Sequence, residues 1–222
     1  MNSSRALLLT FAFGTVVSIS ACSIARELAQ RDPDRGPITR ELAWDSAESL
    51  VVGVPADVRF VQAHGPGKIV VTGPRRSVET FSAAGGVLDD ATWRTGERLR
   101  IIVTAPKVTR FSVKGHDMLV IENFDQDELR IATTGWADVR AAGRARTIRL
   151  ELLGSGWADL SQVDTHGAEV SLTSLRNAIV APRAWARISG DGDVILTTEP
   201  AEISQVPAGG GRVIRVRPRS SM

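Results

Sequence analysis

The sequence is poor in aromatic residues: it has no tyrosine, and aromatic side chains make up only 5% of its 222 residues. A core with so few large rings must be filled mainly by valine, isoleucine and leucine. Together with 20 glycines, this composition favours thin β-layers joined by many turns. Cys22 is the single cysteine, which excludes an intrachain disulfide and a cysteine-based zinc site.

An excess of charge of one sign is also missing, because 27 basic residues nearly cancel 25 acidic ones. A nucleic-acid interface needs clustered cations with aromatic side chains among them, and no segment has that pattern. We therefore expect no nucleic-acid partner. The length leaves room for one large domain or two small ones.

Residues 1–21 have the organisation of a secretory signal peptide. An early cation, Arg5, precedes an apolar stretch from Ala6 to Val17, and small residues follow it. A transmembrane helix needs about 20 apolar residues, so this stretch is too short to span a bilayer. We expect the segment to be removed from the mature protein.

The end of this segment, Ile19-Ser20-Ala21-Cys22, resembles the bacterial lipobox. The resemblance implies cleavage before Cys22, diacylglycerol on its sulfur and a further acyl chain, such as palmitate, on its new amine. Several acyl chains anchor a protein stably, whereas one is marginal. We expect a lipoprotein of the bacterial cell envelope, attached to the outer membrane because Ser and not Asp follows Cys22. The alternative is an ordinary signal peptide with a chance cysteine.

Two flanking segments differ from the rest of the chain. Residues 22–44 are polar and contain Pro33 and Pro37, which predicts a flexible tether between membrane and domain. Residues 206–222 form a basic C-terminal segment, in which arginines alternate with apolar residues from Arg212 to Arg219. We interpret them as a terminal strand and tail with a solvated face, and contact with anionic lipid headgroups is the alternative.

After residue 108 the chain becomes repetitive. Apolar–polar–apolar triplets begin at residues 111, 129, 148, 168 and 186, and a second short apolar run follows each triplet after small or polar residues. A spacing of 18 to 20 residues is too short for helical-hairpin repeats of about 33 or more. It fits the coils of an all-β parallel β-helix, a β-solenoid that we expect to be right-handed, with strands that pair in parallel between coils.

This fold predicts which side chains point inward, because neighbours on a strand point to opposite sides. One inward column contains the apolar residues of the triplets: Ile131, Leu150, Val170 and Ile188. The residue before each of them is expected to face solvent: Arg130, Arg149, Glu169 and Arg187.

The repeated strand, glycine-rich turn and strand resemble the GIN domain of putative auto-transporter adhesin heads. The clearest copies run from Leu150 to Leu160 through Gly154-Ser155-Gly156, and from Ile188 to Val194 through Gly190-Asp191-Gly192. The resemblance implies a secreted or lipid-anchored β-helix over about residues 45–205, with no catalytic residue.

Trp136 and Trp157 recur in two copies of Gly-Trp-Ala-Asp. In a solenoid we expect them to stack at neighbouring corners, where exposed aromatic rings bind sugar faces or partner surfaces. The alternative is a structural stack that shields the corner.

Acidic residues recur at the start of the second strand of several coils: Asp138, Asp159 and Asp193. We interpret them as turn caps, with a calcium-binding column as the alternative. His64, His116 and His166 are too far apart for adjacent coils, which argues against a metal site or catalytic triad. We expect no cofactor and no metal.

These features predict a non-catalytic envelope lipoprotein with an adhesin-head-like binding domain, whose partner is an envelope protein or a glycan. One alternative is a polysaccharide-active enzyme on the same fold, which would need paired carboxylates in a cleft. The other is a structural or assembly lipoprotein of the outer membrane.

Overall fold

The computed structural model describes residues 36–44, 48–91, 98–173, 177–207 and 210–216. Every element below belongs to one compact unit, Pro37–Met222. The predicted signal peptide and Cys22 lie outside the described residues. Among the residues that are described, no helix is long and apolar enough to cross a membrane.

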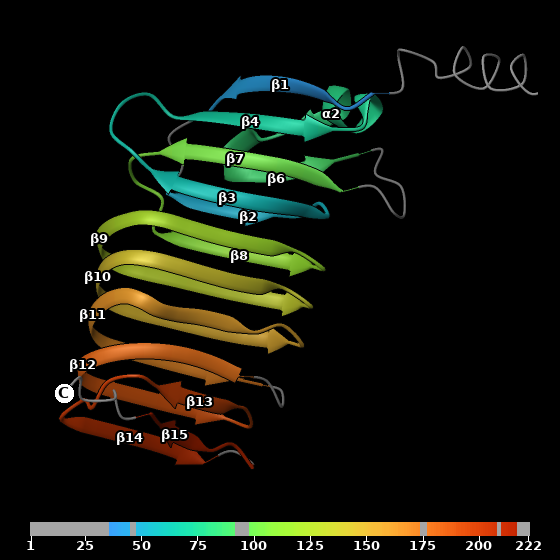
Figure 1. The fold of residues 1–222 in the computed structure, drawn as a ribbon. Helices are drawn as coiled ribbons and strands as arrows, with labels where there is room; N and C mark the ends of the chain where they lie inside the picture. Colours follow the sequence, from blue (N-terminus) through green and yellow to red (C-terminus); the bar gives the residue numbers. More distant parts are fainter. Residues whose placement is uncertain (1–35, 45–47, 92–97, 174–176, 208–209, 217–222) are drawn as a thin grey trace, which may run out of the picture. The chain divides into compact units, whose positions relative to one another are not determined.

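Four long strands form the middle of the domain and confirm the predicted β-solenoid. They pair in parallel, each with the next along the chain. Each one bends, so that its first part lies on one face of the solenoid and its second part on the other (Figure 1). The fold has about five turns. The four strands are β9 (Met118–Gly135), β10 (Asp138–Gly154), β11 (Ala158–Leu172) and β12 (Asn177–Gly190).

The N-terminal part of the domain consists of shorter elements. β2 and β8 extend the face that holds the second halves of the long strands, and β3 extends the opposite face. The strands are β1 (Ile38–Ala43), β2 (Ser49–Val52), β3 (Ala56–Gln62), β4 (Lys68–Gly73), β5 (Phe81–Ser82), β6 (Val87–Asp90), β7 (Leu99–Ala105) and β8 (Arg110–Gly115). The helical elements are α2 (Arg75–Thr80) and a 3-10 turn, η2 (Ala84–Gly86).

Three short strands form the C-terminal part. β14 (Glu202–Pro207) pairs with the second half of β12, while β13 (Asp193–Leu196) pairs with the first half of β12 and with β15. β15 (Val213–Arg215) lies in the basic segment, and its Ile214 and Arg215 are exposed.

One part of the tether prediction is wrong. Residues 38–43 form β1, which pairs antiparallel with β4. Pro33 and Pro37 precede this strand and so remove no hydrogen bond from its ladder. Ile38 and Leu42 pack against the core, and Trp44 after the strand is buried. Burial of these apolar side chains explains why the segment is ordered.

The predicted inward column is confirmed. Ile131, Leu150, Val170 and Ile188 are buried and occupy matching positions on four consecutive strands. The four charged residues that precede them are exposed, as expected. The apolar residues at every second position therefore form the core, and the strand register follows from that alternation.

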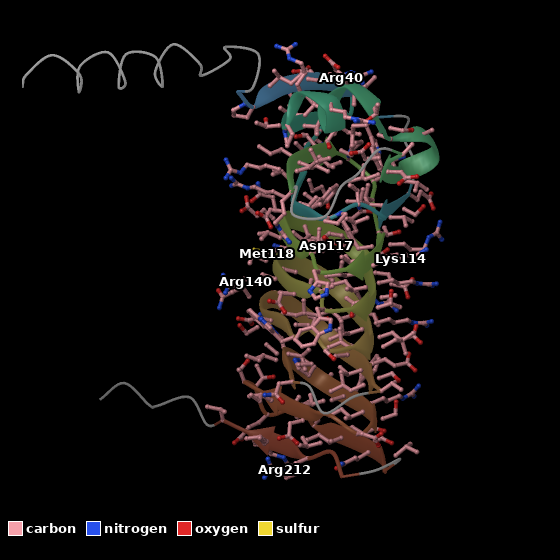
Figure 2. The ribbon with its side chains drawn as sticks, turned by 90° about the vertical axis from the view of Figure 1, so that its right-hand side faces the viewer. Arg40, Lys114, Asp117, Met118, Arg140 and Arg212 are labelled. Atoms are coloured by element: carbon pink, nitrogen blue, oxygen red, sulfur yellow. The ribbon has the colours of Figure 1, made fainter. Side chains whose placement is uncertain are left out.

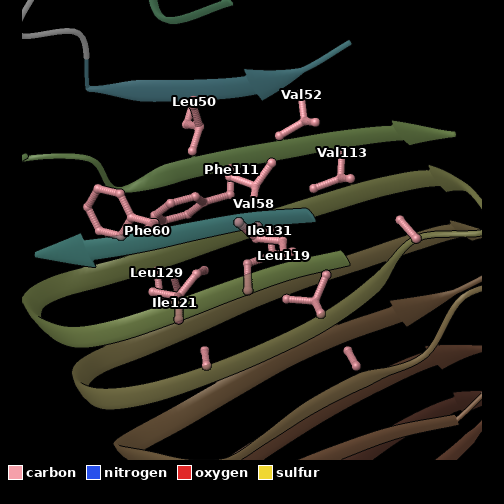
Figure 3. Close-up of a cluster of buried hydrophobic side chains, with 14 of the residues drawn as sticks. Leu50, Val52, Val58, Phe60, Phe111, Val113, Leu119, Ile121, Leu129 and Ile131 are labelled. Carbon is pink, nitrogen blue, oxygen red and sulfur yellow. The ribbon is translucent and has the colours of Figure 1, made fainter. Parts of the chain in front are cut away.

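The N-terminal end of the solenoid core contains a small aromatic cluster. Phe60 packs edge-on against Phe111 with a centroid distance of 5.0 Å, and Phe111 packs against Phe124 at 6.4 Å. Figure 3 shows Phe60 and Phe111 among the aliphatic side chains of β2, β3, β8 and β9. Edge-to-face contact is a favourable arrangement of aromatic rings, so three of the few phenylalanines stabilise the junction between the N-terminal strands and the coils.

Candidate functional site

Glycine allows the chain to turn between the end of one strand and the start of the next. Gly115 and Gly135 have φ of 107° and 89°, a region that side chains with a Cβ avoid. Successive turns also lie in direct contact, because the backbone N–H of Trp136 donates to the Gly115 carbonyl at 2.7 Å. We call this edge of the solenoid the glycine corner.

A groove of about 430 Å³ runs along the glycine corner. Figure 2 shows this side of the domain, with Asp117 and Met118 near its middle. The walls combine aromatic rings, carboxylates and a hydroxyl, and their residues are Asp57, Arg98, His116, Asp117, Met118, Trp136, Asp138, Ser155 and Trp157.

Trp136 provides the most exposed ring of the groove, with 57% of its surface accessible. Its indole lies nearly parallel to the imidazole of His116, with a centroid distance of 5.6 Å and an interplanar angle of 8°. Stacking on His116 holds the indole in one orientation. The groove therefore has a preoriented aromatic surface in contact with solvent.

Trp157 also lines the groove, but not at the position equivalent to Trp136. Gly154 pairs with Gly135 and Ala158 with Val139, so the register places Trp157 beside Asp138. The backbone N–H of Trp157 donates to Asp138 Oδ1 at 3.2 Å. The expected equivalence of the two tryptophans is therefore wrong. They are 21 residues apart (157 − 136), whereas the coil between the paired glycines is 19 (154 − 135).

The Trp157 ring has a cationic neighbour. The guanidinium of Arg140 lies 5.0 Å from the ring centroid, a distance at which a cation is attracted to the face of an indole. Trp157 thus forms a half-buried wall with Arg140 against it, whereas Trp136 is the exposed ring.

Asp117 is a buried carboxylate behind the groove. Its Oδ1 accepts a hydrogen bond from the backbone N–H of Ala56 at 2.9 Å, and no described residue donates to its Oδ2. Burial raises the pKa of the Asp117 carboxyl to about 6, against the lowering effects of the Ala56 hydrogen bond and of nearby Arg98 and His116. The carboxyl thereby joins the start of β3 to the first turn of the solenoid.

Arg98, an exposed residue, also links β3 to the turn before β9. It makes an ion pair with Asp57 at 2.6 Å and donates to the backbone carbonyl of His116 at 2.7 Å. These contacts fix the turn that presents His116 to Trp136. The Asp57 carboxylate keeps lone pairs for further donors, because a carboxylate accepts several hydrogen bonds.

Of the three recurring acidic residues, Asp159 alone bonds to a residue close in sequence, as a turn cap would, whereas Asp138 and Asp193 bond to a neighbouring coil. Asp138 accepts from the Trp157 backbone, and Asp159 Oδ1 accepts from the backbone and hydroxyl of Ser161 at 3.0 and 2.6 Å. Asp193 makes an ion pair with Arg212 at 2.8 Å. Within the described part of the chain, no three His, Cys, Asp or Glu side chains are grouped closely enough to hold a metal ion.

Comparisons with known proteins agree with this architecture. The family profile described as "Putative auto-transporter adhesin, head GIN domain" matches residues 48–200. No curated protein matches the sequence.

Several solved structures share the fold at low sequence identity. A putative adhesin from Bacteroides fragilis is 17% identical, with a TM-score of 0.65 over 81% of this chain and 97% of that one. A putative adhesin from Parabacteroides distasonis is 12% identical, with a TM-score of 0.52 over 82% and 98% of the two chains. A putative lipid binding protein from the same species is 15% identical, with a TM-score of 0.50 over 82% and 97%.

Proposed function

The chain belongs to the family of auto-transporter adhesin head GIN domains, and we propose that it is a non-catalytic binding module of the bacterial cell envelope. In this proposal, Cys22 carries the lipid anchor, and the groove at the glycine corner binds a glycan. The single observation that carries the glycan proposal is the exposed indole of Trp136, held parallel to His116.

The groove has the two kinds of group that sugar recognition requires. The apolar C–H face of a sugar ring packs on a flat aromatic side chain, and Trp136 provides such a surface. The hydroxyls of the ring need acceptors and donors at its edge, and Asp57, Asp138 and Ser155 line the same groove. Few well-placed polar groups around an apolar surface are typical of small-ligand sites.

The arrangement of the carboxylates supports binding rather than hydrolysis. A glycoside hydrolase needs one carboxyl that donates a proton and a second that acts as base or nucleophile. Asp117 has the raised pKa of a general acid, but its carboxyl is buried and bonded to Ala56. Asp57 and Asp138 are engaged with Arg98 and the Trp157 backbone. The contacts of these carboxylates hold the turns of the glycine corner in place, which fits a binding module.

A glycan array tests the proposal with the soluble domain and two variants. We expect the wild-type domain to bind a subset of glycans, and Trp136→Ala to reduce that binding at least tenfold. Trp185→Ala is the matched control, because it removes an indole that lies beside Arg187 on another part of the solenoid. Equal binding by wild type and Trp136→Ala would refute the corner groove as the ligand site.

Hydrolysis must be measured on the same glycans. If the wild-type domain releases reducing ends and Asp117→Asn does not, the protein is a polysaccharide-active enzyme and not a non-catalytic binding module. We expect no release above the level of heat-denatured protein.

A further inference from the structure

Each long strand bends partway along its length (Figure 1). A second groove, of about 750 Å³, lies along these bends. The bends require unusual backbone, with positive φ at Asn123 and Gly143. At the bends, polar side chains of consecutive strands lie side by side, in two columns. We call this site the bend groove.

The first column is internally paired. Arg144 lies between Asp125 and Asp164 in the register and makes an ion pair with Asp125 at 3.9 Å. Arg183 pairs with Asp164 at 2.8 Å. On β3, the side-chain Nε2 of Gln62 donates to the backbone carbonyl of Asp125, and its Oε1 accepts from the backbone N–H of Asp125. This column forms a charge-balanced wall of the groove.

The second column is different. Asp127, Arg146 and His166 follow one another on β9, β10 and β11, because the pairs on either side of them are in register. All three are exposed and line the groove. No ion pair or side-chain hydrogen bond engages the Arg146 guanidinium, the Asp127 carboxylate or the His166 ring within the described residues. The same holds for the ammonium group of Lys107 on the groove wall.

The unengaged groups define the chemistry of a ligand. Among the described residues that line the groove, the unpaired charged groups are two cations, Arg146 and Lys107, and one carboxylate, Asp127, so this part of the groove favours a negative group. A guanidinium binds a carboxylate through two parallel hydrogen bonds. Asp127 can accept from a hydroxyl, and His166 can accept from or donate to one. Each lies one strand, about 4.8 Å, from Arg146 along the stack of strands.

The paired column restricts the ligand further. Asp125 and Asp164 would repel a densely charged polymer that carried several negative groups per unit. A ligand with no more than one carboxylate on each sugar ring and many hydroxyls satisfies both columns. We propose that the bend groove binds an acidic oligosaccharide that carries one carboxylate on a sugar ring, and that Arg146 and Lys107 hold that carboxylate. This site is separate from the corner groove and does not depend on its proposed function.

Calorimetric titration of the mature domain tests this inference with three uronate oligosaccharides, from polygalacturonate, alginate and hyaluronan. We expect binding of at least one, and a loss of tenfold or more in Arg146→Gln, the size expected for a charge-assisted hydrogen bond. The methyl ester of the same oligosaccharide, which lacks the negative charge, should bind as weakly. Lys107→Gln should weaken binding in the same direction.

Two control variants separate this site from the rest of the surface. Arg187→Gln removes an exposed arginine beside Trp185, and Trp136→Ala alters only the corner groove. Both should bind the uronate as the wild type does. The inference is overturned if none of the three uronates binds, if Arg187→Gln loses as much affinity as Arg146→Gln, or if the methyl ester binds equally well. Competition by inorganic phosphate at equal concentration would also overturn it, because simple anion attraction would then suffice.

Discussion

The carboxylate of Asp117 accepts a hydrogen bond from the backbone N–H of Ala56, a residue 61 positions earlier in the chain. This contact fastens the N-terminal strands to the first glycine turn at the place where the corner groove begins. The buried carboxyl makes the junction sensitive to pH, since its ionised form lacks the hydration it would have in the unfolded chain.

Asp117→Asn should change how stability depends on pH. The pKa of Asp117 is about 6 in the folded protein, against 3.8 for an ordinary aspartate. The folded state therefore holds this proton more tightly, and the stability it contributes is complete below pH 3.8 and lost as the pH rises through 6. Asparagine keeps an oxygen for Ala56 and does not ionise.

Urea melts of wild type and Asp117→Asn at several pH values check this prediction. Between pH 3.5 and 7, the unfolding free energy of the variant should rise relative to that of the wild type by on the order of 3 kcal/mol. Other titrating groups are common to both proteins and cancel in the difference. A difference that does not vary with pH would contradict the burial of this carboxyl.

Gly190 and Gly65 provide a test of how closely the turns stack. Both have nearly the same positive φ, 103° for Gly190 and 105° for Gly65. A Cβ on Gly190 would overlap the carbonyl of Leu172 on the preceding coil, whereas a Cβ on Gly65 would meet nothing within 4 Å. Gly65→Ala should cost about 1 kcal/mol from backbone strain alone.

Gly190→Ala should cost at least about 1 to 3 kcal/mol more, because overpacking adds to the same strain. Thermal melts of the two variants provide the comparison. Equal losses of stability would mean that the coils are not in contact at Gly190.

The register of the coils is tested by adjacent substitutions. Leu150→Asp places a charge in the inward column and should cost several kcal/mol. Arg149→Ser removes exposed ion pairs with Glu128 at 3.0 Å and Glu169 at 3.6 Å, and should cost at most about 1 kcal/mol. If denaturant melts show that Arg149→Ser is the more damaging change, the strand faces the opposite way.

Much of the fold could be predicted from the sequence because each coil repeats the same alternation of inward and outward residues. The column through Leu150 follows from that alternation alone. β1 could not be found in this way, since it lies outside the repeat and is stabilised by antiparallel pairing with β4. A polar, proline-containing segment gives no sign of that partner.

The corner groove was only partly predictable, for two reasons. Matching the letters of the Gly-Trp-Ala-Asp copies aligns Trp136 with Trp157, but the strands align Trp136 with Ser155, because Gly135 pairs with Gly154 and not with Gly156. The buried Asp117 could not be predicted from the sequence, because its carboxylate bonds to Ala56, 61 residues earlier, and no local pattern links the two. The lack of a second glycine after Gly115 was the one available indication of an unusual turn.

Lipid attachment at Cys22 remains a prediction from the sequence. Mass spectrometry of the mature protein from membranes should find an N-terminal peptide that begins at Cys22 and carries acyl chains. Cys22→Ala should leave the domain folded, with unchanged circular dichroism, and release it from the membrane fraction. An unmodified Cys22, or a mature N-terminus elsewhere, would disprove the anchor.

The most direct test of the account is a crystal structure of the mature domain with a glycan that binds to it on the array. The account predicts a sugar ring packed against the indole of Trp136, with its hydroxyls within hydrogen-bonding distance of Asp57, Asp138 or Ser155. A glycan bound elsewhere, with the corner groove empty, would contradict the central claim.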